Sequence, residues 1–278
     1  MNAAFGGHNL REGMRWLWVL GLGCIFLAVL NGRWGRAQNE ELSVIPVTRP
    51  GPLVRPGFYR LDRDIRVKKH GLVIRSSDVI LDLNGKSIIH RYHPGCRHNL
   101  LTVEARGDIE IRNGRFVGGR CGICLRATHG VIRIHHLTFE RQRLSAIFAR
   151  EGETDGKLFI EDNLISHAGF YGVILRRVDH ATVRNNTIDS AGDYGIYVVY
   201  SHGGHIENNH IQVTNIGILV DNSKENHVEG NRIHYSYYSI YLFKSFRNII
   251  RKNIMAFSNF GVFHYKSDDN LVKDNKRM

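Results

Sequence analysis

Residues 183–199 read VRNNTIDSAGDYGIYVV, and residues 206–220, which begin 23 positions later, read IENNHIQVTNIGILV. Both stretches place an Asn three positions after an aliphatic residue and an Ile two positions after that Asn. This Asn recurs at intervals of 23, 23, 22, 22 and 22 residues, as Asn163, Asn186, Asn209, Asn231, Asn253 and Asn275. Repetition at such a period predicts an array of stacked structural units.

A second register accompanies the first. It consists of Gly172, Gly195, Gly217, Ser239 and Gly261, spaced by 23, 22, 22 and 22 residues. Each of these residues is followed by Val or Ile. Upstream, Gly122-Ile123 and Ala146-Ile147 continue the pattern with longer intervals, although the earlier units lack the Asn.

The units hold short runs of β-branched residues broken by Gly and Asn, which is typical of strands. A unit of this length cannot bury its apolar face alone, so successive units must stack. Parallel stacking at ~4.8 Å per unit aligns equivalent residues into columns. The sequence therefore predicts an all-β, single-stranded right-handed parallel β-helix of about eight or nine coils over residues 70–278. Aliphatic columns fill its interior.

The Asn column is expected to be structural. Asn tolerates the left-handed backbone of a bend between two strands. Its amide can also bond to the backbone of the next coil, and this would satisfy polar groups that the bend leaves unpaired.

Two segments precede the repeat. Residues 1–37 have the layout of a signal peptide: Arg11 and Arg15, the 15-residue apolar run 16–30, then small residues at Gly35 and Ala37. The run is shorter than the ~20 residues of a spanning helix. This favours a cleaved signal over an uncleaved anchor and predicts a periplasmic or secreted protein. Residues 38–69 carry four of the five prolines and are expected to cap the β-helix.

The formal net charge of +12 favours an anionic partner, and export argues against nucleic acid. Cleavage of the signal would leave three cysteines. In an oxidising compartment a Cys96–Cys121 bridge is compatible with the sequence. The Cys121-Gly-Ile-Cys124 spacing also suits a redox pair, but its position inside a repeat favours a structural role.

A family resemblance rests on Pro56–Leu61 (PGFYRL), Asp78–Gly85 (DVILDLNG) and the repeats. Together these segments resemble bacterial right-handed β-helix proteins. Such proteins include pectate-lyase-like folds, alginate-type C5-epimerases and lyases, and periplasmic β-helix proteins of copper-enzyme maturation. The resemblance covers residues 56–278 and implies the fold far more than any one reaction.

Alternation along the strand after each Gly assigns outward positions. They are Cys124 and Arg126, Phe148 and Arg150, Ile174 and Arg176, Tyr197 and Val199, Leu219 and Asp221, Tyr241 and Phe243, and Phe263 and Tyr265. Arg177, Tyr200, Asn222, Lys244 and Lys266 flank this stripe. An arginine column with ~5 Å spacing is costly unless an anion or an acid compensates its charge.

The stripe predicts an elongated groove for an acidic polysaccharide, because Arg binds carboxylates and aromatic faces suit sugar rings. The residues expected to bind the polymer are Arg126, Phe148, Arg177, Asp221, Tyr241, Lys244 and Tyr265. The alternative interpretation is an ordinary exposed strand with solvated charges and scattered aromatic residues. Service in exopolysaccharide assembly, as a monomer, would fit the groove.

Uronate lyases and C5-epimerases remove the C5 proton, which requires a neutralised carboxylate, a base and a proton donor. Arg150 and Arg176 are the candidates for neutralisation, and Tyr197, Tyr200 or His202 for proton transfer. The Tyr-Gly of the epimerase motif is present at Tyr171 and Tyr194, but its Asp-Pro-His is missing. Whether the chain is an enzyme stays open, with lyase or epimerase favoured over hydrolase because no paired carboxylates lie on the stripe.

The remaining alternative is a non-catalytic scaffold or a periplasmic protein that handles a metal for a partner enzyme. His90, His93 and His98 share one loop, and His202 and His205 share another. Imidazoles in a loop can bind copper or zinc. No supporting Cys or Met set is evident from the sequence, and 16 histidines make chance clusters common. We therefore expect neither a metal site nor a cofactor.

Overall fold

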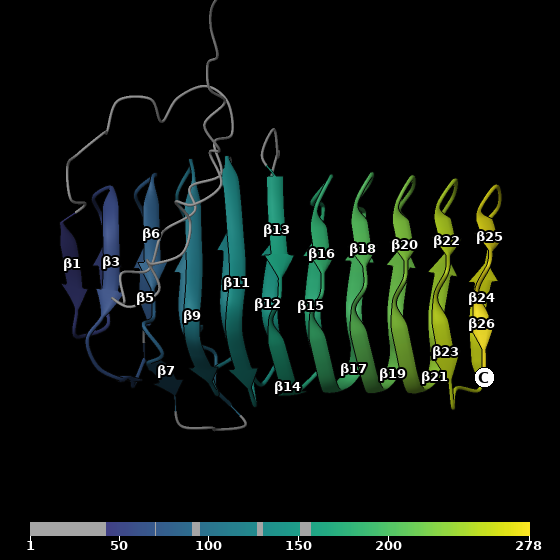
Figure 1. Ribbon diagram of the computed structural model, residues 1–278. Helices are drawn as coiled ribbons and strands as arrows, with labels where there is room; N and C mark the ends of the chain where they lie inside the picture. Colours follow the sequence, from purple (N-terminus) through teal and green to yellow (C-terminus); the bar gives the residue numbers. More distant parts are fainter. Residues whose placement is uncertain (1–42, 70, 91–94, 127–129, 151–156) are drawn as a thin grey trace, which may run out of the picture. The chain divides into compact units, whose positions relative to one another are not determined.

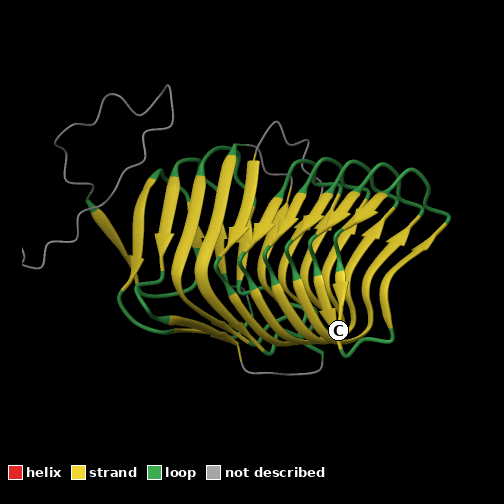
Figure 2. Ribbon diagram, turned by 45° about the vertical axis from the view of Figure 1, so that its right-hand side comes forward, coloured by secondary structure: helices red, strands yellow, loops and turns green. Residues whose placement is uncertain are grey.

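The computed structural model describes residues 43–69, 71–90, 95–126, 130–150 and 157–278. Every regular element among them is a strand, and the 26 strands join in one sheet through parallel pairings. The fold is the predicted right-handed parallel β-helix, with about nine turns. Figures 1 and 2 show the turns following one another along a single axis in sequence order.

Each full turn contributes to three parallel ladders, which we number in chain order. The first ladder contains β1 (Val44–Val47), β3 (Gly57–Leu61), β6 (Val79–Asp82), the start of β9 (Ile109–Val117) and β11 (Val131–Glu140), β13 (Lys157–Glu161), β16 (Thr182–Arg184), β18 (His205–Glu207), β20 (His227–Glu229), β22 (Ile249–Arg251) and β25 (Leu271–Lys273).

The second ladder contains β4 (Ile65–Val67), β7 (Ser87–His90), the ends of β9 and β11, β14 (Leu164–Ala168), the starts of β17 (Thr187–Val199), β19 (His210–Asp221) and β21 (Arg232–Phe243), β23 (Ile254–Ala256) and β26 (Lys276–Arg277). The third ladder contains β2 (Pro52–Leu53), β5 (Leu72–Ile74), β8 (Leu101–Val103), β10 (Cys121–Arg126), β12 (Ser145–Arg150), β15 (Tyr171–Arg176), the ends of β17, β19 and β21, and β24 (Phe260–Tyr265).

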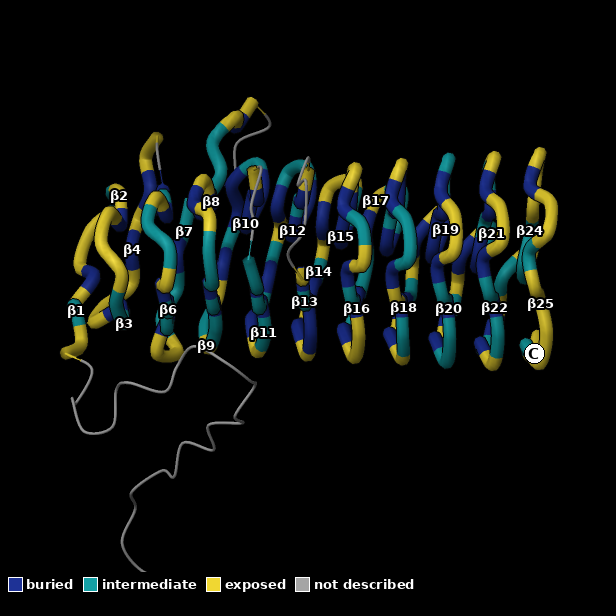
Figure 3. The backbone as a smooth tube through the Cα atoms, turned by 90° about the horizontal axis from the view of Figure 1, so that it is seen from above, coloured by how far each residue is buried: buried dark blue, intermediate teal, exposed yellow. Residues whose placement is uncertain are grey.

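The interior is filled by the predicted aliphatic columns. Ile160, Val183 and Ile206 are fully buried in the first ladder, and Ile188 is fully buried in the second. Figure 3 shows the buried positions recurring turn after turn along the axis. The stack extends over many turns, so its core is a continuous rod in which each turn packs only on its neighbours.

The Asn column is structural, as predicted. The Asn209 Nδ2 donates to Val183 O at 2.9 Å and to Asn231 Oδ1 at 3.0 Å. The Asn209 Oδ1 accepts from the backbone N and from Nδ2 of Asn186, both at 3.0 Å. The left-handed bend, however, lies one residue earlier than the column, with φ of 54° at Asn208. The sequence assigned both the left-handed bend and the hydrogen bonds between turns to one Asn. In the structure Asn208 forms the bend, and Asn209 makes the hydrogen bonds.

A second polar column was missed from the sequence. Asn226 Nδ2 donates to Asn248 Oδ1 at 3.1 Å, and Asn248 Nδ2 donates to Asn270 Oδ1 at 2.9 Å. Three residues before each Asn, a Ser hydroxyl accepts from the backbone N–H of the previous turn, as Ser245 Oγ does from Ser223 N at 3.2 Å. A Ser-x-x-Asn motif at a 22-residue period was the signal for this column.

The Gly register lies where the third ladder approaches the second. A Cβ on Gly195 would lie 2.5 Å from Ile211 Cγ2 and 2.6 Å from Gly217 O. We expect Gly195→Ala to lower the free energy of unfolding by about 1–3 kcal/mol, because the backbone oxygen belongs to a ladder and cannot yield. Gly261→Ala is the matched control, since the nearest atom to its Cβ is Met255 Sδ at 3.5 Å. Urea denaturation of both variants is the measurement, and equal stability would contradict this explanation.

A cap was predicted for residues 38–69. The described part of this segment lies at the end of the stack and takes part in its pairing, since β1 pairs with β3 and β4 with β7. The predicted signal peptide lies outside the described residues. Within the described ranges, no helix is long and apolar enough to cross a membrane. Cys96, Cys121 and Cys124 are buried and free, so the Cys96–Cys121 bridge is not formed.

Candidate functional site

The candidate site is the outward side of the third ladder, from β10 to β24, which we call the third-ladder face. Register places its predicted residues in columns, one residue per turn. One column runs through Arg126, Arg150, Arg176, Val199, Asp221, Phe243 and Tyr265. The neighbouring column runs through Cys124, Phe148, Ile174, Tyr197, Leu219, Tyr241 and Phe263. The pairing register therefore places these residues in the two columns that alternation along the sequence predicted.

The arginine column divides into a paired and an unpaired part. Arg126 contacts Glu104 with 3.3 Å between Nη1 and Oε1, and Glu104 also contacts Arg75 at 3.2 Å. Arg150 and Arg176 lie on the next two turns and are exposed. Within the described ranges neither forms an ion pair. Two adjacent cations without an acid repel each other, so an added anion would lower their energy.

A third column, missed from the sequence as a site, lies immediately before the Gly register. Tyr171 and Tyr194 occupy adjacent turns, with ring centroids 5.4 Å apart and planes at 12°. Tyr197 stacks on both, at 5.8 Å from Tyr171 and 5.2 Å from Tyr194. The Tyr-Gly pairs at both positions were the available signal. Because the rings stack on each other, their faces are occupied, and the hydroxyl edges are left for a ligand.

A second aromatic group lies over β21 and β24. Tyr238 stacks on Phe260 at 5.0 Å and lies 5.2 Å from both Tyr241 and Phe263. Phe243 stacks on Tyr265 at 5.8 Å. Aromatic residues therefore dominate the C-terminal part of the face, but their mutual packing makes them poorer platforms for sugar rings than the sequence suggested.

Asp221 lies between the stacked tyrosines of β15 and β17 and the aromatic group over β21 and β24. Its Oδ2 accepts from the Tyr197 hydroxyl at 2.7 Å, and its Oδ1 accepts from Asn222 Nδ2 at 2.6 Å. Burial, followed by the hydrogen bond to Asp221, raises the pKa of Tyr197. Tyr197 therefore keeps its proton over a wide pH range. It is suited to donate a hydrogen bond or a proton and unsuited to act as a base.

The flanking residues share a backbone conformation. Arg177, Tyr200, Asn222, Lys244 and Lys266 all have φ between 46° and 57°, which places each at the bend that ends its strand. Three of these side chains lie over neighbouring rings. Arg177 Cζ is 5.9 Å from the Tyr200 ring centroid, Lys244 Nζ is 5.2 Å from that of Phe243, and Lys266 Nζ is 5.4 Å from that of Tyr265. Cations therefore border the face at Arg177, Lys244 and Lys266, with the uncharged Tyr200 and Asn222 between them.

His202 lies in the turn beyond the face. Its Nδ1 accepts from Lys224 N at 3.1 Å, and its own backbone N–H donates to Asp179 Oδ1 at 2.7 Å. The ring nitrogen that accepts is not available for a substrate proton. Its predicted role in proton transfer stays a prediction, but these contacts give it a structural role in the turn.

Several outward positions are buried although they lie outside the core cluster. The exposed fractions are 2% for Cys124, 8% for Ile174, 6% for Val199 and 8% for Leu219. The accessible part of the face is therefore narrower than alternation suggests. Its exposed side chains include the three arginines and Tyr265, whereas the edges of Tyr171, Tyr194 and Tyr197 and the Asp221 carboxylate are partly exposed.

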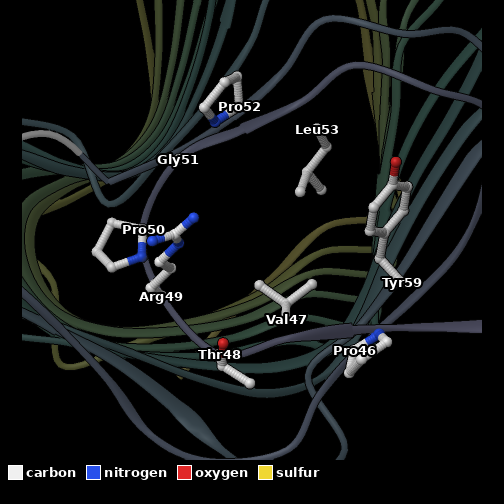
Figure 4. A pocket seen from close by; sticks show the side chains of 9 residues that line it. All are labelled: Pro46, Val47, Thr48, Arg49, Pro50, Gly51, Pro52, Leu53 and Tyr59. Carbon is white, nitrogen blue, oxygen red and sulfur yellow. The ribbon is translucent and has the colours of Figure 1, made fainter.

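A hollow of about 480 Å³ lies elsewhere, at the first turn of the stack. Figure 4 shows Val47, Leu53 and Tyr59 pointing into it from β1, β2 and β3. These three side chains belong to the core cluster. The hollow is therefore the end of the apolar interior and offers no charged group except Arg49.

Among the described residues, no group of three or more His, Cys, Asp or Glu is arranged as a metal site. The Cys96 Sγ lies 3.7 Å from each nitrogen of the His90 ring, and Nδ1 of His135 lies 2.7 Å from Nδ1 of His136. His93 lies outside the described residues.

The model of the family described as "Periplasmic copper-binding protein (NosD)" matches residues 61–234 and 189–277. No curated protein matches the chain. The periplasmic alginate epimerase AlgG is 12% identical, with a TM-score of 0.51, and the alignment covers 82% of this chain and 77% of AlgG.

A mutant of AlgG gives 10% identity and a TM-score of 0.56 over the same shares. The mannuronan C-5 epimerase AlgE6 A-module of Azotobacter vinelandii gives 12% identity, a TM-score of 0.47, and coverage of 86% of this chain and 91% of the module. At these identities, the likeness to AlgG shows the fold alone.

Proposed function

Since the chain belongs to the family of the periplasmic copper-binding protein NosD, we propose that it works in the cell envelope and binds an acidic polysaccharide there through its third-ladder face. The observation that carries the proposal is the exposed pair Arg150 and Arg176, which faces solvent without an ion pair among the described residues, whereas Arg126 is compensated by Glu104. A polymer with carboxylates would supply the missing negative charge.

The spacing of the face favours an extended ligand over a single anion. Adjacent turns are ~4.8 Å apart, so the two guanidinium groups are offered in sequence along the axis. Tyr171 lies on the same turn as Arg176, and Tyr194 with Tyr197, then Asp221, follow on the next two turns. These groups can hydrogen-bond sugar hydroxyls. Arg binds carboxylates with two parallel hydrogen bonds, which gives such contacts a defined direction.

Uronate chemistry is the finer version of the proposal. The face offers arginines to neutralise a carboxylate and Tyr197 to donate a proton. Uronate chemistry also needs a base, and two candidates are poor ones. The raised pKa of Tyr197 keeps this residue protonated, and the Nδ1 of His202 already accepts a hydrogen bond from Lys224 N. Tyr200 is exposed at the border and is the remaining candidate. We therefore place binding ahead of lyase or C5-epimerase activity. A role in exopolysaccharide assembly stays a prediction.

The test uses the mature protein with alginate, polygalacturonate, glucuronan and a neutral glucan. Alginate is included because AlgG, which shares the fold, is an alginate epimerase. We expect binding to the acidic polymers only, weakened as salt rises from ~0.1 M to ~1 M, where the screening length falls from ~10 Å to ~3 Å. Equal binding to the neutral glucan would contradict the proposal.

The same incubations also show whether the protein catalyses a reaction on the polymer. Ultraviolet absorbance of an unsaturated uronate would reveal a lyase, and exchange of solvent deuterium into C5, followed by NMR, would reveal an epimerase. Salt-sensitive binding with neither signal would establish a polysaccharide-binding scaffold.

A further inference from the structure

We propose that the protein docks on an anionic phospholipid surface through the corner where its second ladder bends into its third. Val213, Tyr235 and Phe257 occupy equivalent positions of consecutive turns there, and we call these three residues the apolar corner. Their exposed fractions are 51%, 56% and 69%. Figure 1 shows β19, β21 and β23, which carry or immediately precede them, side by side along the stack. The inference does not depend on the polysaccharide proposal.

The backbone of the apolar corner is in the left-handed region, with φ of 55° at Val213, 53° at Tyr235 and 52° at Phe257. This conformation is costly for residues with a Cβ atom and most costly for a β-branched residue such as Val. Earlier turns place polar residues at the same position, namely Arg141, His167 and Ser190. Asn fits such a bend with less strain, as it does at Asn208. Exposed apolar side chains at strained positions are explained better by a surface contact than by the fold.

Ring packing gives the corner a protruding apolar surface. Tyr235 stacks on Phe257, with ring centroids 5.0 Å apart and planes at 8°. Tyr237 is 47% exposed, and its ring lies 5.5 Å from that of Phe260, which is 40% exposed. A small ligand is held in a concave site, which a protruding bend does not offer. A row of protruding aromatic side chains instead suits the interface of a bilayer, where Tyr is enriched and apolar side chains enter the boundary between headgroups and acyl chains.

The charges around the corner are positive. Residues 232–267 contain no Asp or Glu. Arg232 is exposed at the start of β21 and forms no ion pair among the described residues. On the last turn, Arg277 Nη2 donates to the backbone oxygens of Ser258 and Asn259 at 3.0 Å and 2.8 Å, which holds its guanidinium beside the apolar corner. Cations beside exposed rings attract anionic headgroups while the rings enter the bilayer, so both groups contribute to binding.

An acidic polysaccharide matches this surface less well. It would contact the cations and leave the exposed rings in water, whereas a bilayer with anionic phospholipids engages both groups at once. The corner also borders the third-ladder face, because β19 and β21 run through both ladders. Docking through the corner would therefore hold this face next to the lipid surface.

The experiment measures sedimentation of the mature protein, from residue 38 onward, with phospholipid vesicles. The apolar run 16–30 is left out because it would bind lipid by itself, and every described strand lies within residues 44–277, so the mature chain retains the whole β-helix. We expect binding to vesicles of phosphatidylcholine mixed with phosphatidylglycerol, little binding to phosphatidylcholine alone, and weaker binding as salt rises. The combined change Tyr235→Asn and Phe257→Asn should lower the partition coefficient at least tenfold.

Asn suits a left-handed bend, so the melting temperature of this double variant should not fall. That result separates loss of the lipid contact from loss of the fold. Phe246→Asn is the matched control, because Phe246 is 41% exposed and lies between β21 (Arg232–Phe243) and β22 (Ile249–Arg251), outside the corner. Its partition coefficient should stay within about twofold of the wild-type value.

A fluorescent probe locates the contact. The three tryptophans, Trp16, Trp18 and Trp34, all precede residue 38, so Phe257→Trp introduces the only tryptophan of the mature chain. Its emission should shift to shorter wavelength with anionic vesicles and stay unchanged with alginate, whereas Phe246→Trp should show no shift with either. The proposal is overturned if the wild type does not bind anionic vesicles, if the double Asn variant binds them as tightly as the wild type, or if alginate shifts the Phe257→Trp emission as much as the vesicles do.

Discussion

An Asn209→Ala variant should lose about 2–6 kcal/mol of unfolding free energy. Asn209 is 1% exposed and its side chain makes four hydrogen bonds. Alanine would leave the backbone N–H of Asn186 and the carbonyl of Val183 without these partners, whereas the Asn186 Nδ2 keeps its bonds to Ile160 O and Arg184 O. Each unsatisfied buried group costs about 1–3 kcal/mol. Urea denaturation of the purified variant measures the loss.

Asn215→Ala is the control from the same turn, because Asn215 is exposed and a surface change of this kind stays within about 0.5 kcal/mol. Hydrogen exchange adds a directional check. In Asn209→Ala the backbone amide of residue 186 should lose protection, whereas the amide of residue 209 keeps its acceptor, Asn231 Oδ1, at 2.9 Å. Equal stability of the two variants would show that the column is dispensable.

The second large effect is expected at the arginines. Replacing Arg150 and Arg176 together by Ala should weaken binding of an acidic polysaccharide about tenfold to a hundredfold and reduce its dependence on salt. Hydrogen bonds to charged groups contribute about 1.5–3 kcal/mol, and exposure lowers this contribution. Calorimetric titration with the best polymer of the panel is the measurement. The melting temperature should not fall, because neither arginine is paired among the described residues.

Arg184→Ala provides the matched control. It removes a positive charge from the first ladder, where Arg184 contacts Glu161 at 2.8 Å, and leaves the third-ladder face unchanged. Affinity for the polymer should stay within about twofold. If Arg184→Ala weakens binding as much as either single Arg→Ala change on the face, net charge alone governs the interaction and the face has no special role.

The fold could be predicted because Asn and Gly recur at a nearly constant period, and only the stacking of equivalent turns explains such a recurrence. The Asn column repeats because its amides bond to neighbouring turns, as predicted, although the left-handed bend lies one residue earlier. Gly repeats because a Cβ at positions such as Gly195 would meet the neighbouring turn, a reason that the sequence did not reveal. The position of the left-handed residue was harder to predict, since Asn208-Asn209 offers two candidates. The later turn Gly230-Asn231 separates them, because Gly230 has a φ of 68° and Asn231 stays in the column.

The site was only partly predictable. The repeat period and the alternation along each strand predicted which residues share a column. The orientation of each ring depends on side-chain torsions, so the stacking of Tyr171 on Tyr194 could not be deduced. The pairing of Arg126 with Glu104 was also missed, because the turn with Glu104 lacks the Asn that aligns later turns. The contact of Cys96 with His90 lies in an irregular connection, where no period relates the two residues.

The side-chain amides of the two Asn columns all point the same way. In each column the Nδ2 side of one Asn faces the next turn, and its Oδ1 faces the previous turn, as Asn231 and Asn248 illustrate. Strand dipoles largely cancel in a sheet, whereas these carboxamide dipoles add along the axis. Polarisation along such a chain strengthens each member. Each column therefore carries a dipole along the axis, with its partial negative end toward the earlier turns and its partial positive end toward the last turn.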